Sequence, residues 1–262
     1  MFVDSHGRPL FFEALHEGAQ CIRLHLKEEA DRSIALAMCA DADIVIDSSL
    51  PGTLSRPGME RRRLRQRSPR LVYCSITGLG NDGGNISLPG HDIHFLAASG
   101  LVAALGLTPG GKLPAFPLGD IAGGVLCAEA EILAALLARP VTGMGTELTV
   151  SVTDMLKDLN VVSRVIEASR EQPDGAFLVG TFPRYRLYWA ANHNTMLALG
   201  ALEEAFRHRF CDLIGRSDLV AGQFATRDQE AHIHEAAEAS LLATDAISWE
   251  RLAERPHAAS PQ

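Results

Sequence analysis

The chain has 262 residues, of which 47% are hydrophobic and 21% charged, and its formal net charge is −8. This composition predicts a folded protein with a buried core and excludes a disordered chain. We expect no nucleic-acid partner, because proteins that bind nucleic acid usually carry a basic field. The most apolar run, residues 123–137, is interrupted by two glutamates, so we also expect no segment that spans a membrane and no membrane partner.

The five cysteines are odd in number, widely spaced and without a CxxC pair. This pattern favours reduced thiols over a disulfide framework or a zinc site. The N-terminal residues lack a basic segment followed by an apolar core, so no signal peptide is expected. The sequence therefore predicts a cytoplasmic protein without a bound metal.

Strand and helix patterns alternate along the first part of the chain. Residues 1–19 show no period, and a strand-like alternation begins at Cys21. The succession of patterns predicts an α/β fold with a partial doubly wound parallel sheet, which we expect to be Rossmann-like. The expected strands are 21–26, 43–49 and 71–76, and the expected helices are 27–40 and 60–67.

The middle of the chain contains a glycine-rich loop followed by two helices. Residues 77–90 hold five glycines and a proline, which is typical of a working loop. A helix is expected from His91 to Leu105, and a second helix is expected over 121–138 with Asp120 as its N-cap. A strand over 146–152 and a helix from Thr153 complete this part.

The patterns weaken after Arg170. Residues 171–180 are rich in proline and glycine and are expected to form a linker. Two strands, 181–190 and 195–201, and helices from Glu203 and Arg227 are expected to follow, with a disordered tail over 255–262. We therefore predict a first domain over 1–170 and a smaller mixed α+β segment over 171–262.

Two polar residues at helix starts are candidates for proton transfer. His91 and Asp120 precede the two helices of the middle region, and the outward N–H groups of a first helical turn favour a charged carboxylate. Each residue alone is also typical of an ordinary helix cap. Gly123 and Gly124, one turn later in GDIAGG, favour the close approach of a backbone or a ligand.

The arginines between residues 61 and 70 are the basic cluster of an acidic chain. Such a cluster binds phosphate groups in some proteins and is a solvated helix face in others. Backbone N–H groups of the glycine-rich loop are a second candidate for holding an anion. The sequence lacks GxxxxGK[ST] and GxSxG, so nucleotide binding by a P-loop and serine hydrolysis are not supported.

Five motifs, in order and at familiar spacings, resemble the class III CoA-transferase family, with the closest likeness to its alpha-methylacyl-CoA racemases. They are DIVIDSSLPGTL, SPRLVYCSITGLGNDGG, PGHDIHFLAASG, PLGDIAGG and GMGTELTVSVTDML. The likeness covers residues 21 to 206. It implies an enzyme that acts on an acyl-CoA, with coenzyme A as part of the substrate and no other cofactor. It also implies a homodimer of open, interlocking subunits.

The resemblance assigns roles to individual residues. In the racemases, a histidine and an aspartate at the positions of His91 and Asp120 face the two sides of the substrate's α carbon. A later glutamate, here Glu203 with Glu204 as the near alternative, supports the histidine. The candidate residues for binding coenzyme A and the thioester are Arg61, Arg65, Gly78, Gly80, Gly123 and Gly124.

Two alternative functions remain open. CoA-transferases of the family use an aspartate nucleophile, which the resemblance places at Asp154. The histidine of the GHD motif favours a racemase, whereas Ser75, where racemases usually have arginine, favours a transferase. The chain also lacks the family's first strand and its C-terminal return segment, so a truncated, inactive binding or assembly subunit is the third expectation.

Overall fold

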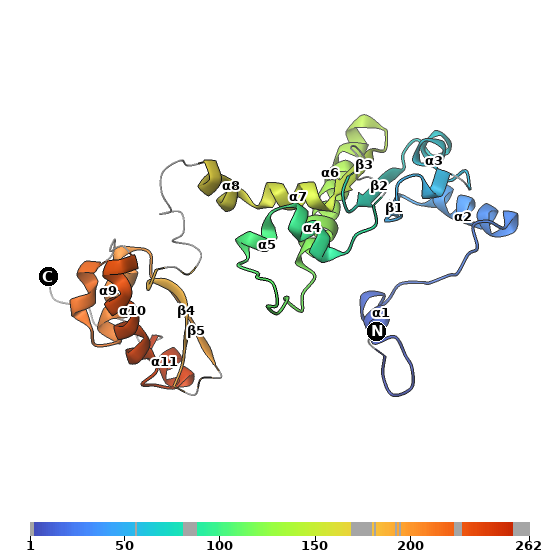
Figure 1. Cartoon of the computed structure of the whole chain (residues 1–262). Helices are drawn as coiled ribbons and strands as arrows, with labels where there is room; N and C mark the ends of the chain where they lie inside the picture. Colours follow the sequence, from blue (N-terminus) through green and yellow to red (C-terminus); the bar gives the residue numbers. More distant parts are fainter. Residues whose placement is uncertain are drawn as a thin grey trace. The chain divides into compact units, whose positions relative to one another are not determined.

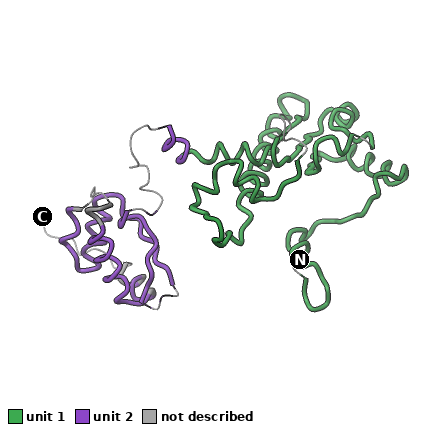
Figure 2. The backbone as a smooth tube through the Cα atoms, in the orientation of Figure 1, with its two compact units in different colours: residues 1–161 green, residues 162–262 purple. Residues whose placement is uncertain are grey.

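The computed structural model describes residues 3–55, 57–80, 88–168, 180, 182–191, 193, 195–222 and 227–253. The chain divides into two compact units, residues 1–161 and residues 162–262 (Figure 2). The tail expected to be disordered and most of the expected linker lie outside the described residues.

The first unit is built around a parallel sheet of three strands (Figure 1). Its order is β1 (Ile44–Asp47), β2 (Val72–Thr77) and β3 (Glu147–Ser151), and both neighbouring pairs run parallel. All three strands were predicted from short apolar or alternating runs, although β1 is shorter than expected. The parallel α/β architecture is therefore confirmed.

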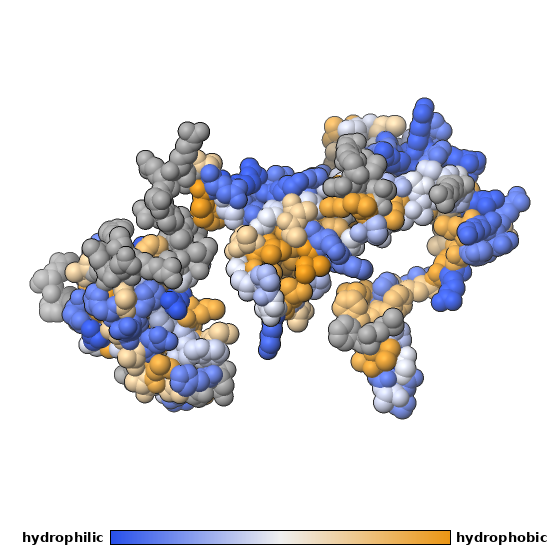
Figure 3. Space-filling model, in the orientation of Figure 1, coloured by the Kyte–Doolittle hydropathy of each residue, from blue (hydrophilic) through white to orange (hydrophobic). Residues whose placement is uncertain are grey.

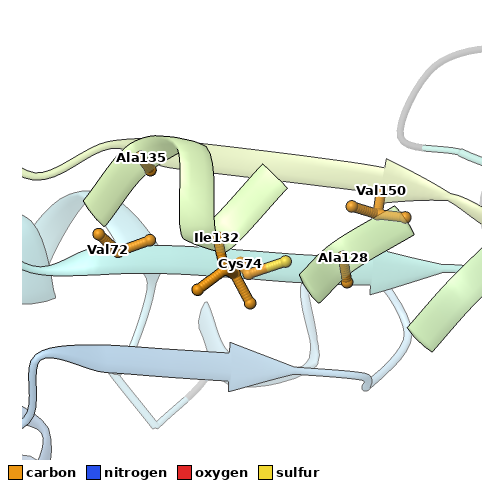
Figure 4. Close-up of a cluster of buried hydrophobic side chains, with 6 residues drawn as sticks. All are labelled: Val72, Cys74, Ala128, Ile132, Ala135 and Val150. Atoms are coloured by element: carbon orange, nitrogen blue, oxygen red, sulfur yellow. The ribbon is translucent and has the colours of Figure 1, made fainter. Parts of the chain in front are cut away.

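Helices cover both faces of this sheet because successive side chains of a strand point to opposite sides. One face packs against α6 (Cys127–Thr142), where Ala135 lies beside Val72 and Ile132 lies beside Cys74 (Figure 4). The other face of β2 packs against α2 (Glu29–Asp41) and α3 (Arg61–Arg67). Both helices were predicted.

A second layer of helices positions the candidate site. The π-helix η2 (Gly119–Leu126), which runs directly into α6, packs with α4 (Asp92–Ala98) and α7 (Val152–Leu159). Their shared core contains Phe95, Leu96, Val152 and Leu156. The remaining elements of the first unit are α1 (Leu10–Leu15), η1 (Thr53–Ser55) and α5 (Leu101–Ala104), and α8 (Val161–Ala168) begins at the boundary and belongs mostly to the second unit.

Three local predictions are wrong. Residues 21–26 form no strand, and Ile22 is 58% exposed, because the described residues supply no hydrogen-bonded neighbour for this segment. The helix expected from His91 to Leu105 is broken at Gly100, whose φ of +82° belongs to the left-handed region. Asp120 is not an N-cap but the second residue of η2, which begins at Gly119 after the N-cap Leu118.

The continuous helical stretch Gly119–Thr142 is long and apolar enough to cross a membrane, by length and composition alone. The two glutamates within it were expected to exclude a membrane span, and by length and composition they do not. Leu137 and Val141 are 80% and 90% exposed, while the opposite side of the helix packs on the sheet. Figure 3 shows that apolar side chains reach the surface of both units.

The second unit contains an antiparallel pair of strands, β4 (Tyr185–Trp189) and β5 (Met196–Gly200). Tyr188 of β4 packs into a core with residues of the helices that follow, so one face of the pair is covered. This confirms the expected strands and a mixed α+β composition. The helices are α9 (Glu204–Leu213), η4 (Ser217–Gly222), α10 (Arg227–Leu241) and α11 (Ala246–Ala253).

Candidate active site

His91 occupies the N-cap position of α4, with an extended backbone (φ −124°, ψ 168°). Its backbone N–H donates to Nδ1 of His94 at 3.0 Å. This bond closes the first turn of α4 through the side chain at the third helical position, as in a capping box. The ring of His91 is left at the exposed start of the helix.

The starts of α4 and η2 are joined by a hydrogen bond between residues 28 positions apart. The backbone N–H of Asp120 donates to Oδ1 of Asp92 at 2.8 Å. Asp92 directly follows His91 in the chain, so the bond brings the two segments that carry the predicted proton-transfer residues together. The structure thus places His91 and Asp120 at adjoining helix starts.

The charges at these helix starts act on one another. Loss of part of its water shell raises the pKa of the Asp120 carboxyl, the Asp92 charge raises that pKa further, and His91 lowers it. The net rise is opposite to the effect that a helix start alone predicts. A carboxylate with a raised pKa is a stronger base once ionised, which suits proton abstraction.

Gly123 and Gly124 are buried where η2 meets α7. A Cβ on Gly123 would lie 2.7 Å from the backbone oxygen of Val152 and 2.7 Å from Cγ of Leu156. A Cβ on Gly124 would lie 3.4 Å from Cγ2 of Val152, which is an ordinary contact. The backbone of α7 therefore approaches Gly123, whereas Gly124 faces side chains. The role of both glycines toward a thioester stays a prediction.

This difference predicts opposite effects for two neighbouring substitutions. Gly123→Ala is expected to destabilise the protein by about 1–3 kcal/mol because its methyl group would overlap the Val152 carbonyl. Gly124→Ala is expected to be neutral or to stabilise by up to about 1 kcal/mol, since alanine is the better helix former. Urea unfolding of both variants measures the two effects. Equal losses would contradict the packing of η2 on α7.

Asp154 lies in the first turn of α7, and its surroundings differ from those of Asp120. The Ser151 hydroxyl and Lys157, whose Nζ is 2.9 Å from Oδ1, hold the pKa of this carboxyl below its usual range. Asp154 is not among the groups that shift the pKa of Asp120. It lines an open cavity of about 390 Å³ together with Arg61, Gly80, Glu147, Thr149, Ser151 and Met155.

The two arginines expected to contact coenzyme A are engaged with the protein. Arg61 Nε lies 2.8 Å from Oε1 of Glu147, and Arg65 Nη1 lies 3.7 Å from Oε2 of the same side chain. Arg65 also donates from Nη2 to the Gly145 carbonyl at 3.1 Å. A phosphate at this cluster would therefore compete with Glu147.

The two loop glycines expected to contact the substrate follow β2. The Gly78 carbonyl accepts hydrogen bonds from the backbone and the hydroxyl of Thr153, at 3.1 and 2.7 Å. A Cβ on Gly78 would overlap the ring of Phe95. Gly80 has a φ of +85° and lies beside Asp154. Gly78 thus ties the start of the loop to α7.

Glu203 is the exposed N-cap residue of α9 in the second unit. Its neighbour Glu204 lies 3.7 Å from Nε2 of His208. Because His91 belongs to the first unit, support of His91 by Glu203 stays a prediction.

Sequence reasoning missed the roles of Asp92 and His94. Both residues stand in the motif PGHDIHF, and each makes a hydrogen bond that shapes a helix start. The position of His94, three residues after a helix start, is a signal for a cap. The partner of Asp92 is 28 residues away, so local spacing gave no sign of it.

The sequence pattern of the family described as CoA-transferase family III matches residues 2–260. The chain belongs to CoA-transferase family III. Named members of this family include both racemases and CoA-transferases, so membership alone does not distinguish the two reactions.

Individual relatives in the family show the same division. The chain is 30% identical to human alpha-methylacyl-CoA racemase over 236 residues, which cover 86% of the chain and 60% of the relative. It is 35% identical to acetyl-CoA:oxalate CoA-transferase of Acetobacter aceti over 147 residues, 55% of the chain and 38% of the relative. The chain thus spans less than two thirds of the length of either protein.

Solved structures of the family share the fold. An aspartate-to-alanine variant of Rv3272 from Mycobacterium tuberculosis aligns with a TM-score of 0.77 and 27% identity, over 96% of the chain and 67% of that structure. A CAIB/BAIF family protein from Brucella suis aligns with a TM-score of 0.72 at 24% identity, over 97% of the chain and 69% of that structure, a likeness of fold alone.

Proposed function

We propose that this protein interconverts the two configurations at the α carbon of a 2-methylacyl-CoA. His91 and Asp120 are the two acid–base residues, one for each side of that carbon. The observation that carries the proposal is the hydrogen bond from the Asp120 N–H to Asp92, which joins the two helix starts. The similarity to human alpha-methylacyl-CoA racemase over 86% of the chain supports the choice of reaction.

The proposed chemistry is a 1,1-proton transfer. One residue removes the α proton, the electron pair moves into the thioester to give an enolate, and the other residue returns a proton to the opposite side. A positioned acid or base contributes about 10²–10⁴-fold to such a step. The raised pKa of Asp120 favours its part as a base.

Other parts of the proposal come from the family likeness. Glu203 is proposed to orient the imidazole of His91, and the glycines after β2 are proposed to lie near the thioester. Coenzyme A enters as part of the substrate, without a redox group or metal ion. We further propose a Rossmann-like sheet and a cytoplasmic homodimer of interlocking subunits.

Incubation with one enantiomer of a 2-methylacyl-CoA in deuterated water tests the reaction. Mass spectrometry and chiral separation are expected to find deuterium at the α carbon together with loss of configuration. Heat-denatured protein serves as the control. An α carbon that keeps both its hydrogen and its configuration would rule out the proposal.

A second candidate function is CoA transfer between carboxylic acids. The transferase of Acetobacter aceti and the position of Asp154 at an open cavity favour it. The carboxylate would attack the thioester carbonyl and expel the CoA thiolate, leaving a mixed anhydride. The thiolate would then attack the aspartyl carbonyl, which releases the donor acid and leaves CoA on Asp154 as a thioester. The acceptor acid would displace this thiolate to form a second mixed anhydride, and attack of the thiolate on the acceptor's carbonyl would give the new acyl-CoA and free Asp154. An acyl adduct trapped on Asp154 and absent from Asp154→Asn would support this function. A protein with neither activity would fit a binding or assembly subunit.

The proposed homodimer leads to a prediction for α6. Its outward side exposes Leu133, Leu137 and Val141, a row of apolar side chains that association with a second copy would cover. Leu137→Asp is expected to shift the protein from dimer to monomer in light scattering coupled to size exclusion. Glu129→Asp on the same helix serves as the control. A Leu137→Asp variant with unchanged mass would exclude this face as the contact.

A further inference from the structure

The start of η2 is capped by a side chain from another element. The N-cap residue Leu118 has no polar side chain, and the backbone N–H groups of a first helical turn lack partners within the helix. Asp92 of α4 accepts a hydrogen bond from one of these groups, the N–H of Asp120, at 2.8 Å. A carboxylate is a favourable partner there because it also complements the helix dipole. Asp92 thus supplies a cap that the sequence around η2 lacks.

Gly119 leaves the space that this carboxylate occupies. A Cβ on Gly119 would lie 2.9 Å from Oδ1 and 3.4 Å from the backbone oxygen of Asp92. Gly119 is buried, so little free space exists into which the carboxylate could move. The glycine at 119 and the aspartate at 92 therefore form one fitted contact between α4 and η2.

This contact is adjacent to both proposed acid–base residues. Asp92 directly follows His91, and the N–H that it binds belongs to Asp120 itself. We propose that Asp92 is a positioning residue, whose carboxylate caps η2 and thereby holds Asp120 in place relative to His91. This inference rests on the proposed function for its consequence in catalysis, but the contact itself is tested independently of activity.

The charge of Asp92 adds an effect that a neutral cap would not have. It raises the pKa of Asp120, whereas His91 lowers it. From α7, which also packs on η2, the charged residues Asp154, Lys157 and Asp158 are not among the groups that shift this pKa. Removal of the Asp92 charge with retention of its acceptor oxygen should therefore lower the pKa of Asp120.

Two substitutions separate the charge from the hydrogen bond. Asp92→Asn keeps an acceptor oxygen and removes the charge, whereas Asp92→Ala removes both. The carboxyl carbon of Asp120, assigned by its loss in Asp120→Asn, is titrated by ¹³C NMR in the full chain. Its midpoint is expected to fall in Asp92→Asn, because the neighbouring negative charge is removed. Asp41→Asn, at a distant exposed site, is the control. An unchanged midpoint in Asp92→Asn would overturn the inference.

The pH profile of α-proton exchange provides the second readout. In Asp92→Asn the acid limb is expected to move to lower pH with the Asp120 midpoint, and in Asp92→Ala the plateau rate is expected to fall at least tenfold. Suppose that the wild type shows an Asp120 midpoint above the usual range of an aspartate but no α-proton exchange. The proposed function would then be refuted, and the contact between Asp92 and Asp120 would remain supported. Suppose instead that the wild type exchanges the α proton and that Asp92→Asn has the same Asp120 midpoint and the same pH profile as the wild type. Only the positioning role of Asp92 would then be refuted.

Discussion

Replacement of His91 with alanine is expected to lower the rate of racemisation of a 2-methylacyl-CoA by about 10²–10⁴-fold. The imidazole is proposed to exchange a proton with one side of the α carbon, and alanine has no group that does so. The variant keeps the bond from the backbone N–H of residue 91 to His94 and loses the half of the capping box that the His91 side chain makes. Chiral separation of the acyl-CoA at several times after mixing measures the rate.

The matched control for this prediction is His25→Ala. His25 is an exposed histidine whose Nδ1 lies 3.5 Å from a carboxyl oxygen of Glu28, at the surface of the same unit. Its loss is expected to leave racemisation unchanged. Equal rates in the wild type and His91→Ala would remove His91 from the mechanism.

Truncation of Ile132 to alanine is expected to destabilise the protein by about 2–5 kcal/mol. Ile132 is 7% exposed and packs from α6 against Val72, Cys74 and Val150 on the sheet. Alanine would remove three buried carbon atoms and leave a cavity between the helix and β2. Chemical denaturation followed by circular dichroism gives the free energy of unfolding.

Ile22→Ala makes the same chemical change at an exposed position and is the control. Ile22 is 58% exposed in a segment without regular structure, so its loss is expected to change stability by about 0.5 kcal/mol or less. A similar loss in both variants would contradict the placement of Ile132 in the core.

The parallel sheet was predictable because the alternating apolar residues of β2 and β3 indicate strands without reference to the rest of the chain. Val72, Cys74 and Val150 alternate with residues on the other face, and a helix pattern separates the strands. The segment 21–26 has a similar alternation but forms no strand. An alternating pattern shows only that a segment could lie in a sheet. Whether it forms a strand depends on a neighbouring strand, which comes from another part of the sequence.

The candidate site was predictable in its residues but not in its contacts. His91 and Asp120 could be named from their places at helix starts and from the family motifs. The bond between Asp92 and Asp120 spans 28 residues and depends on how α4 packs against η2. The sequence also contains no periodic pattern that indicates the π-helical form of η2. Because η2 begins at Gly119, Asp120 lies inside the helix and not at the expected N-cap.

The central claim is that His91 and Asp120 serve opposite sides of one carbon atom. Deuterium incorporation from each pure enantiomer of a 2-methylacyl-CoA, measured in parallel for His91→Ala and Asp120→Asn, tests it most directly. Each variant should retain exchange with one enantiomer only, and the two variants should retain opposite enantiomers. Loss of exchange with the same enantiomer in both variants, or unchanged exchange in both, would contradict the claim.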